Sequence, residues 1–587
     1  MTWRPSQGSR DRMPAVQPAL DLRKGLTDRP QGRDGRQEAG QGARQGVERQ
    51  RIILVSNRGP VSFSVDPKTG RFHSEPGAGG VVSGLLSATR QRSVTWIAVA
   101  MSDADRAIAR AHAGGEGHVV RDFPNIALRL VDTDENVYRR YYDGVSNKAL
   151  WFIQHYLLQP TRHPLSAQTT RDWEEGYRVV NEAVAQTVID ELEATGLETP
   201  VMFQDYHLYL APGIVRERLP WARLTHFVHI PWPDARYWEL APEVMAKGVF
   251  AGLAANDVIG FQTERDARNF LDGAQRFVSD VTRIEAAPGE VGALLVDGRR
   301  VSARAYPIAV APTEVYAQAN AEPDDETKRL LAQARPTPDH KLILRVDRVE
   351  PTKNIVAGFR AYERMLQCNK RLRGHVTFLA LLVPSREGLA EYRAVMRQTQ
   401  QAIERINRRY GTATWQPIIA VFGNDRARAL ACMRQYDALL VNPLLDGMNL
   451  VVKEGGLVNE RAGVTVLSRT AGAYEQLGPY VLGVPPTDIE AMSEKLLEAL
   501  TMPSRQRHER ATAMLHLLLK ESAATWLQAQ LRDLRQQTAR PRMVYRADTA
   551  TQRLARFPDA DALARETLMA ARHALTPTAP ASSEIHA

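Results

Sequence analysis

The strongest chemical signal in the sequence is a run of polar residues that follows the apolar segment 437–442. Asp446 and Gly447 are typical of a tight turn, and a helix expected from about Asn449 would direct free backbone N–H groups toward an anion such as phosphate. Glu454 lies about one turn further, where a carboxylate can accept hydrogen bonds from ribose hydroxyls. We favour an anion site here over a purely structural turn.

Two cations follow a second apolar run, 341–346. Arg348 and Lys353 are separated by a turn that contains Pro351 and leads into an expected helix. Two cations that converge at a helix start can hold a diphosphate. The alternative is that both are solvated surface charges.

Three further segments place a functional side chain after an apolar run. Arg58 follows 52–56 and precedes a glycine-rich loop, in which Gly79 and Gly80 would allow close approach of an anion; a merely flexible turn is the alternative. Asp205 could hold sugar hydroxyls, act as a base, or simply cap a helix. His229 precedes two prolines that hold it in place, so it is either a site residue or a core histidine.

The elements that must position these residues alternate between strand-like and helical patterns. Strands are expected at 94–100, 126–131, 200–204, 224–230, 257–261, 341–346, 375–383, 417–422, 437–442 and 463–468. Helices are expected between most of them, for example at 176–194, 264–278, 355–367 and 388–409. This pattern predicts an α/β protein with parallel sheets, and two Rossmann-like domains fit it better than one very wide sheet.

A proline-bounded seam at 306–312 divides the chain into expected regions. They are a disordered tail (1–50), an N-terminal Rossmann-like domain (51–312), a C-terminal Rossmann-like domain (313–504), terminal helices (505–537) and a partly disordered extension (538–587). The tail has ten basic and six acidic residues and few apolar ones, so it cannot bury enough surface to order itself.

Composition excludes several classes of protein. The 587 residues are 44% hydrophobic and 24% charged, which is ordinary for a globular chain. The cysteines are Cys368 and Cys432, which rules out a disulfide framework. The absence of a long apolar run and of a signal-peptide pattern predicts a cytoplasmic protein without a membrane helix. The net charge of +9 is not clustered with aromatic residues, so we do not expect a nucleic-acid partner.

Taken together, the motifs resemble glycosyltransferase family 20, the trehalose-6-phosphate synthases. The resemblance covers about residues 51–537 and rests on motifs in family order: Ser56-Asn57-Arg58, Gly79-Gly80, Tyr141-Tyr142 with Ser146-Asn147 and Trp151, Asp205-Tyr206-His207, His229-Ile230-Pro231-Trp232-Pro233, Val383-Pro384-Ser385-Arg386, and Asp446 to Val451 with Glu454. It implies a GT-B fold, in which two Rossmann-like domains face each other across a cleft. It also implies transfer of glucose from UDP-glucose to glucose 6-phosphate with retention at the anomeric carbon.

The resemblance assigns roles residue by residue. The residues that would bind the donor are Gly79, Gly80, Arg348, Lys353, Asn449, Leu450, Val451 and Glu454. Those that would bind the acceptor are Arg58, Tyr142, Trp151, Asp205 and Arg386. Those nearest the chemistry would be Arg348, Lys353, Asp205, His229 and Asp446, with Asp446 and His229 on the transferred glucose. A homo-oligomer is compatible with this assignment.

Many glycosyltransferases hold a divalent metal with paired carboxylates, and the sequence contains three Asp-x-Asp triplets. They are Asp103/Asp105, Asp132/Asp134 and Asp559/Asp561, and none clearly follows a strand beside a sugar-site motif. We therefore expect no metal and no other cofactor. Instead, Arg348, Lys353 and a helix N-terminus would supply preorganised positive charge to the leaving diphosphate.

The sequence departs from the family pattern at two places. The run Glu350-Pro351-Thr352-Lys353-Asn354 replaces the usual Asp-Tyr-Ser-Lys-Gly, and Gln204 replaces a common histidine. These changes keep other family activities open, namely glucosylglycerol-phosphate synthases and validoxylamine-phosphate-type pseudo-glycosyltransferases. A further alternative is an inactive regulator that binds sugar phosphate, although Arg348, Lys353 and Glu454 are all present.

Overall fold

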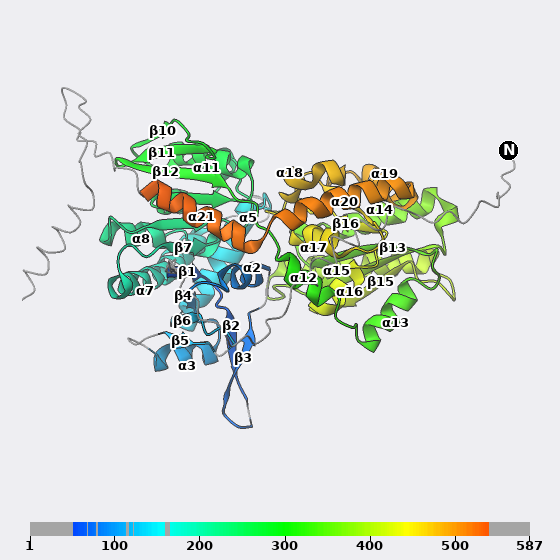
Figure 1. The fold of residues 1–587 in the computed structure, drawn as a ribbon, viewed down its shortest axis with the longest axis horizontal. Coiled ribbons are helices and arrows are strands. Elements are labelled where there is room, and N and C mark those ends of the chain that lie inside the picture. Colours follow the sequence, from blue (N-terminus) through cyan, green and yellow to red (C-terminus); the bar gives the residue numbers. More distant parts are fainter. Residues whose placement is uncertain are drawn as a thin grey trace, which may run out of the picture.

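The computed structural model describes residues 51–66, 68–77, 80–112, 117–120, 122–158 and 165–538. The predicted tail 1–50 and the extension beyond Thr538 lie outside the described residues. Two β-sheets lie in two separate lobes, each covered by helices (Figure 1). This architecture confirms the predicted α/β fold class.

The first lobe is built on a ten-stranded sheet, in the order β10-β11-β12-β9-β8-β7-β1-β4-β6-β5. Its parallel strands are β1 (Ile52–Ser56), β4 (Val94–Val99), β6 (Ile126–Val131), β7 (Val201–Gln204), β8 (Leu224–Phe227), β9 (Val258–Phe261) and β12 (Arg299–Ala305). Strands β5 (His118–Val119), β10 (Val281–Ile284) and β11 (Gly292–Val296) are antiparallel additions at the two edges. The sequence patterns did not identify these additions, because the edge strand β10 is only partly buried and lacks a continuous apolar run.

The second lobe has a six-stranded, fully parallel sheet in the order β15-β14-β13-β16-β17-β18. Its strands are β13 (Lys341–Arg348), β14 (Val376–Val383), β15 (Ile418–Phe422), β16 (Ala438–Val441), β17 (Val464–Ser468) and β18 (Leu482–Val484). Counted along the chain, this is the 3-2-1-4-5-6 order of a doubly wound nucleotide-binding sheet. Ligands bind beyond the carboxyl ends of such strands, which places the site in the loops after β13, β14 and β16.

Helices cover both sheets, since parallel strands that are buried on both faces need cover on both sides. In the first lobe they are α2 (Gly80–Thr89), α3 (Asp103–Ala111), α4 (Glu135–Arg139), α5 (Trp151–Gln154), α6 (Ala167–Asp172), α7 (Val179–Thr195), α8 (Ala211–Arg218), α9 (Ala235–Trp238), α10 (Glu243–Ala254) and α11 (Glu264–Phe277). In the second they are α12 (Pro312–Ala319), α13 (Asp325–Ala334), α14 (Ile355–Cys368), α15 (Ala390–Tyr410), α16 (Arg426–Met433), α17 (Leu450–Val458), α18 (Ala473–Leu477) and α19 (Ile489–Thr501).

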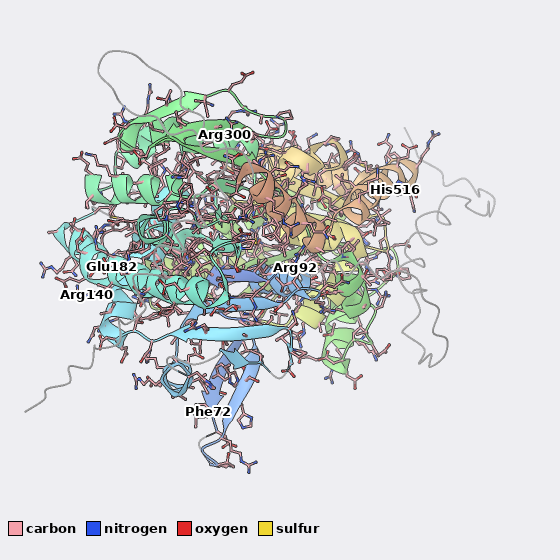
Figure 2. The ribbon with its side chains drawn as sticks, turned by 60° about the vertical axis from the view of Figure 1, so that its left-hand side comes forward. Phe72, Arg92, Arg140, Glu182, Arg300 and His516 are labelled. Carbon is pink, nitrogen blue, oxygen red and sulfur yellow. The ribbon has the colours of Figure 1, made fainter. Side chains whose placement is uncertain are left out.

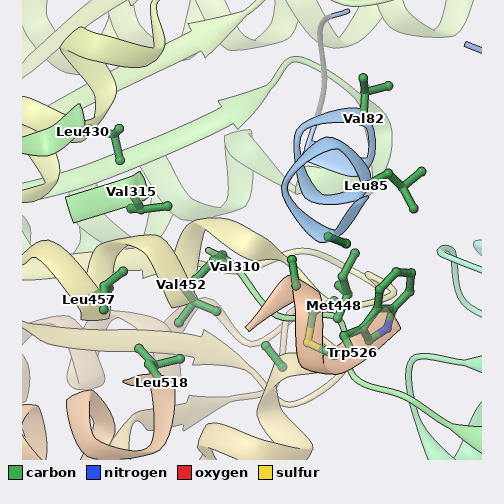
Figure 3. Close-up of a cluster of buried hydrophobic side chains, with 14 of the residues drawn as sticks. Val82, Leu85, Val310, Val315, Leu430, Met448, Val452, Leu457, Leu518 and Trp526 are labelled. Carbon is green, nitrogen blue, oxygen red and sulfur yellow. The ribbon is translucent and has the colours of Figure 1, made fainter. Parts of the chain in front are cut away.

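The two lobes are joined by the last two helices. Helix α20 (Ser504–Lys520) lies against the second lobe, and α21 (Ala523–Thr538) continues onto the first lobe, where it packs on α2 (Figure 1). The Trp526 indole donates to the Tyr306 carbonyl oxygen at 3.0 Å, and the Tyr306 hydroxyl donates to Asp533 at 2.9 Å. One hydrophobic core therefore includes residues of both lobes, among them Met448, Leu518 and Trp526 (Figure 3).

A hairpin extends from the first lobe. Strands β2 (Val61–Val65) and β3 (Phe72–Pro76) pair antiparallel and project from the body, with Phe72 on the projecting part (Figure 2). Phe72 and its cross-strand partner Val65 are 47% and 46% exposed. The sequence analysis did not identify this hairpin, because its strands are short and alternate apolar with polar residues instead of forming a continuous apolar run.

Candidate active site

The loops at the carboxyl ends of the two sheets meet at one point. Gly447, after β16 in the second lobe, lies so close to His229 of the first lobe that a Cβ there would be 2.1 Å from the His229 carbonyl oxygen. A glycine is therefore required for the two lobes to approach each other here. The predicted cleft residues of both lobes are grouped around this contact.

Lys353, Asp446 and Asn449 form a connected group in the second lobe. The Lys353 ammonium forms an ion pair with the Asp446 carboxylate, and the Asn449 amide donates to the same carboxylate at 3.1 Å. Burial lowers the pKa of Lys353, but Asp446 and Asp347 outweigh it and the pKa is raised. Burial likewise favours protonated Asp446, but Lys353 outweighs it and lowers that pKa. Both groups are therefore charged at neutral pH.

The turn that carries Lys353 explains the departure from the family pattern. It is one turn of 3₁₀ helix (Pro351–Lys353), and the following Asn354 has φ 55° and ψ 39°. This left-handed conformation suits glycine, which the family usually has here, and asparagine is among the other residues that tolerate it. The Asn354 amide also donates to the Pro486 carbonyl oxygen at 2.7 Å. The substitution thus keeps the backbone path that directs Lys353 into the cleft.

Arg348 lies at the end of β13, and its side chain is 48% exposed. Its guanidinium is 3.1 Å from the carboxylate of the buried Glu350. It is close enough to Lys353 to oppose that group's positive charge, so the two cations lie in one region of the cleft. Their predicted convergence is present in the structure, while their role toward a diphosphate stays a prediction.

Helix α17 begins beside this group. Asn449 has φ 74°, and Leu450 and Val451 form the first helical residues, so their backbone N–H groups belong to the unpaired first turn. Glu454 is on the same helix. Its carboxylate pairs with Arg426 of α16 at 2.9 Å, and not with Arg348 or Lys353. Burial raises the pKa of Glu454, and Arg426 opposes this rise.

The first lobe holds Arg58 through the residues of its own motif. The Ser56 hydroxyl donates to the Arg58 carbonyl oxygen at 2.6 Å, and the Tyr141 hydroxyl donates to Asn57 at 2.8 Å. The exposed Arg58 guanidinium lies 3.4 Å from the Tyr142 hydroxyl. Burial would raise the pKa of Tyr142, but nearby Arg58 outweighs it and the pKa is lowered. Arg58 and Tyr142 are therefore brought together as predicted.

Arg386 extends from the second lobe onto the first. Its guanidinium lies 4.1 Å from the centre of the Trp151 ring, and it donates to the hydroxyls of Tyr206 at 3.1 Å and Tyr392 at 2.6 Å. Its φ of 45° is in the left-handed region, an uncommon conformation for a residue with a side chain. Such a constraint is typical of a residue held in place for binding, so Arg386 is fixed before any ligand arrives.

Asp205 and His229 are also joined. The His229 backbone N–H donates to the Asp205 carboxylate at 3.2 Å, and the His229 ring Nε2 lies 3.0 Å from the Gln204 side-chain oxygen. Burial raises the pKa of Asp205 to about 7, against the opposing effect of that N–H group. Burial lowers the pKa of His229 to about 3, so its ring is neutral and Nε2 carries the proton donated to Gln204.

Two stretches of π-helix lie in the first lobe, at or beside residues predicted to bind the acceptor, and the sequence patterns did not predict them. They are residues Arg140–Leu150, which carry Tyr142, and residues Trp173–Arg178. The wider turns of a π-helix occur frequently at functional sites. Two contact residues without an assigned role also emerge: Asn147, which accepts from the Tyr206 hydroxyl at 3.0 Å, and Tyr392. Both are buried, and burial cannot be read from residue type alone.

The acidic triplets serve the local structure. Asp105 belongs to a capping box at the start of α3, and Asp134 caps α4. Asp103 pairs with Arg106 and Asp132 with Arg110. Asp559 and Asp561 lie outside the described residues, as does the predicted donor residue Gly79, while Gly80 begins α2.

Within the described ranges, no group of three His, Cys, Asp or Glu residues could hold a metal ion, and no helix is long and apolar enough to cross a membrane.

Comparison with known proteins identifies relatives along most of the chain. Residues 50–536 match the family model described as Glycosyltransferase family 20. The trehalose-6-phosphate synthase of Salmonella arizonae is 29% identical over 495 residues, covering 84% of this chain and 96% of the relative. The validamine 7-phosphate valienyltransferase of Streptomyces hygroscopicus is 28% identical over 504 residues, covering 85% and 97%. The bifunctional trehalose-6-phosphate synthase/phosphatase of Thermoproteus tenax is 30% identical over 490 residues; these are 81% of this chain but 62% of the relative.

Solved structures of similar proteins agree with the fold. A structure from E. coli with bound UDP-2-fluoro glucose has a TM-score of 0.71 and 27% identity, covering 83% of this chain and 99% of that one. The α,α-trehalose-phosphate synthase (UDP-forming) of Burkholderia xenovorans, in complex with glucose-6-phosphate, has a TM-score of 0.69 and 30% identity, covering 83% and 100%.

Proposed function

The chain belongs to glycosyltransferase family 20, and we propose that it transfers glucose from UDP-glucose to glucose 6-phosphate, giving α,α-trehalose 6-phosphate and UDP. Two similar structures support this choice of substrates, since one holds a UDP-glucose analogue and the other glucose-6-phosphate. The observation that carries the proposal is the presence of two unlike groups of cations at one cleft. Lys353 and Arg348 lie beside the start of α17, whereas Arg58 contacts the Tyr142 hydroxyl and Arg386 lies over the Trp151 ring.

In the proposed reaction, the second lobe receives the donor. As the bond between the anomeric carbon and the phosphate oxygen breaks, the diphosphate gains negative charge. Arg348, Lys353 and the first N–H groups of α17 would stabilise that charge without reorganising. Losing one such preorganised donor typically costs about 3–4 kcal/mol of barrier. Asp446 would accept hydrogen bonds from hydroxyls of the transferred glucose, and Glu454 from those of the ribose.

The first lobe would hold the acceptor. Arg58 and Arg386 supply the charge for its phosphate, with Tyr142 and Trp151 shaping the pocket, and Asp205 would orient the sugar. The acceptor hydroxyl would attack the anomeric carbon from the face that the diphosphate leaves, so the configuration is retained. Its proton would pass to an oxygen of the departing diphosphate, which leaves as UDP. No residue has to form a covalent bond to the sugar, and no metal is needed in this scheme.

A substrate matrix tests this proposal. The purified full chain is assayed with UDP-, GDP- and ADP-glucose, each against glucose 6-phosphate, glycerol 3-phosphate and a cyclitol phosphate, with product identified by mass spectrometry and NMR. We expect trehalose 6-phosphate from the UDP-glucose and glucose 6-phosphate pair. No turnover of this pair, or a trapped glucosyl adduct on Asp205 or Asp446, would contradict the proposed reaction.

A second family activity is supported by one comparison. The valienyltransferase covers 97% of its own length in the alignment, at an identity within a few per cent of the synthases. The side chains at the acceptor half, Arg58, Tyr142, Trp151 and Arg386, favour a sugar phosphate in our proposal. Preferential turnover with the cyclitol phosphate in the matrix would assign the chain to this second activity instead.

A further inference from the structure

A histidine that the sequence analysis did not single out lies at the junction of the two halves. His155 follows the short helix α5 and is 4% exposed. Its ring stacks on Trp151, with 4.0 Å between ring centres and 29° between the planes. Its Nδ1 lies 2.9 Å from the Trp151 carbonyl oxygen. Because a carbonyl oxygen can only accept, Nδ1 carries the hydrogen and Nε2 is left with a lone pair.

His155 Nε2 forms no hydrogen bond among the described parts of residues 51–538. It is not one of the fully enclosed polar atoms that lack a partner, so Nε2 keeps some exposed surface through which a ligand can reach its lone pair, although the side chain as a whole is buried. The charged groups that act on the His155 ring come from the second lobe: Asp446, Glu350 and Arg386. His155 is therefore near enough to feel both the arginine assigned to the acceptor and the carboxylate assigned to the transferred glucose.

The state of the ring fits a hydrogen-bond acceptor. Burial lowers the pKa of His155 to about 4, so the imidazole is neutral at the pH of an ordinary assay. A neutral ring can accept a hydrogen bond at Nε2 while Nδ1 keeps its bond to the backbone. The Trp151 ring on which His155 stacks also lies under the Arg386 guanidinium, so the imidazole borders the predicted acceptor site.

We infer that His155 is a sugar-binding residue, whose Nε2 accepts a hydrogen bond from a sugar hydroxyl where donor and acceptor meet. The inference rests on the proposed function, because it requires a sugar on at least one side of the junction. The hydroxyl belongs either to the transferred glucose beside Asp446 or to the acceptor beside Trp151 and Arg386. In both cases Nε2 accepts a hydrogen bond from a sugar hydroxyl, and substrates that lack one hydroxyl distinguish the two cases.

The test combines His155→Phe with substrates that lack one hydroxyl. Phenylalanine keeps an aromatic ring to stack on Trp151 but removes the acceptor, whereas His155→Gln keeps an acceptor. We expect His155→Phe to lower kcat/KM by about 10- to 100-fold, because a buried sugar hydroxyl loses its partner. His155→Gln should recover part of this loss. His340→Phe, at a buried histidine whose Nε2 lies 2.8 Å from the Thr377 hydroxyl, is the matched control for folding.

Monodeoxy forms of UDP-glucose and of glucose 6-phosphate are then assayed with the wild-type chain and with both His155 variants. One deoxy substrate should lower kcat/KM of the wild type without lowering the already reduced kcat/KM of His155→Phe any further. The hydroxyl that this substrate lacks is then the one that His155 binds. A deoxy donor with this behaviour assigns the hydroxyl to the transferred glucose, and a deoxy acceptor assigns it to the other sugar. If every deoxy substrate lowers kcat/KM by the same factor in His155→Phe as in the wild type, His155 binds none of the hydroxyls tested, and the inference is overturned. Turnover of the unmodified pair by the wild type tests the proposed function separately.

Discussion

The two halves of the cleft hold their charges in different ways. In the second lobe, Lys353 is neutralised by the Asp446 carboxylate, and Arg348 is paired with Glu350. On the other side of the cleft, Arg58 of the first lobe lies against the Tyr142 hydroxyl, and Arg386 reaches from the second lobe over Trp151 of the first. The donor half is thus a network of ion pairs on a rigid parallel sheet, whereas the acceptor half consists of cations on aromatic surfaces carried by π-helix and loops.

This difference indicates that the two halves of the cleft have different roles in the reaction. Fixed ion pairs at the ends of sheet strands suit a leaving group that is common to a family, because they need little adjustment during the reaction. Aromatic rings and hydroxyls accept a range of shapes, so the acceptor half is where related enzymes can differ. Variants in the donor half should therefore change turnover, and variants in the acceptor half should change the acceptor KM.

The largest expected effect is that of Arg348→Ala on turnover. Loss of this cation should lower kcat by about 10²- to 10³-fold, because the charge on the leaving diphosphate loses a preorganised partner. The fold should be intact, since the side chain is 48% exposed. Initial-rate kinetics with the best substrate pair measure the effect, and the surface variant Arg409→Ala is the control. A near-normal kcat would show that Arg348 has no role in the reaction. It would also contradict the expectation that variants in the donor half change turnover.

Arg386→Lys should show the opposite signature. A lysine keeps the positive charge but loses the planar group that lies on Trp151 and reaches two tyrosine hydroxyls at once. We expect the KM for the acceptor to rise by about 10-fold or more, with the KM for the donor nearly unchanged. Separate titration of each substrate distinguishes these constants. An equal rise in both would show that the two halves are not separable.

Asp205→Asn should stabilise the fold in a pH-dependent way. The pKa of Asp205 is raised to about 7, whereas an aspartate in the unfolded chain titrates near about 3.9. The folded state therefore binds the extra proton between these values, and wild-type stability falls as the pH rises from about 4 through 7. The variant should gain about 3 kcal/mol relative to the wild type at pH 8 compared with pH 5, because the two pH units between 5 and 7 are worth about 1.4 kcal/mol each. Urea unfolding at both pH values measures this, and an equal difference at both would contradict the raised pKa.

The smallest expected effect is that of metal removal. If Arg348, Lys353 and the α17 start supply the charge, dialysis against EDTA should leave kcat within about 2-fold of its untreated value. The matched measurement adds Mg²⁺ or Mn²⁺ back to the dialysed enzyme. Loss of activity on dialysis that is restored by the metal would assign the donor half to metal-assisted catalysis.

Several features could be predicted from sequence because local patterns dictate them. The buried parallel strands appear as short apolar runs, and the functional residues that follow them could be located for that reason. Asn354 shows the limit of such patterns: it stands where the family pattern has glycine, and its backbone adopts the left-handed conformation that glycine favours. A motif comparison registers a mismatch here, although the backbone conformation is one that suits glycine.

The sequence by itself determined the fold class, most of the buried parallel strands and the identity of the cations that follow them. These depend on apolar periodicity and on turn-forming residues, which act over a few residues. Only the tertiary structure decided which groups meet, such as Gly447 against His229 and Arg386 on Trp151. These contacts join residues far apart in the chain, and the burial that sets the pKa values of Asp205 and His155 arises only in the folded chain.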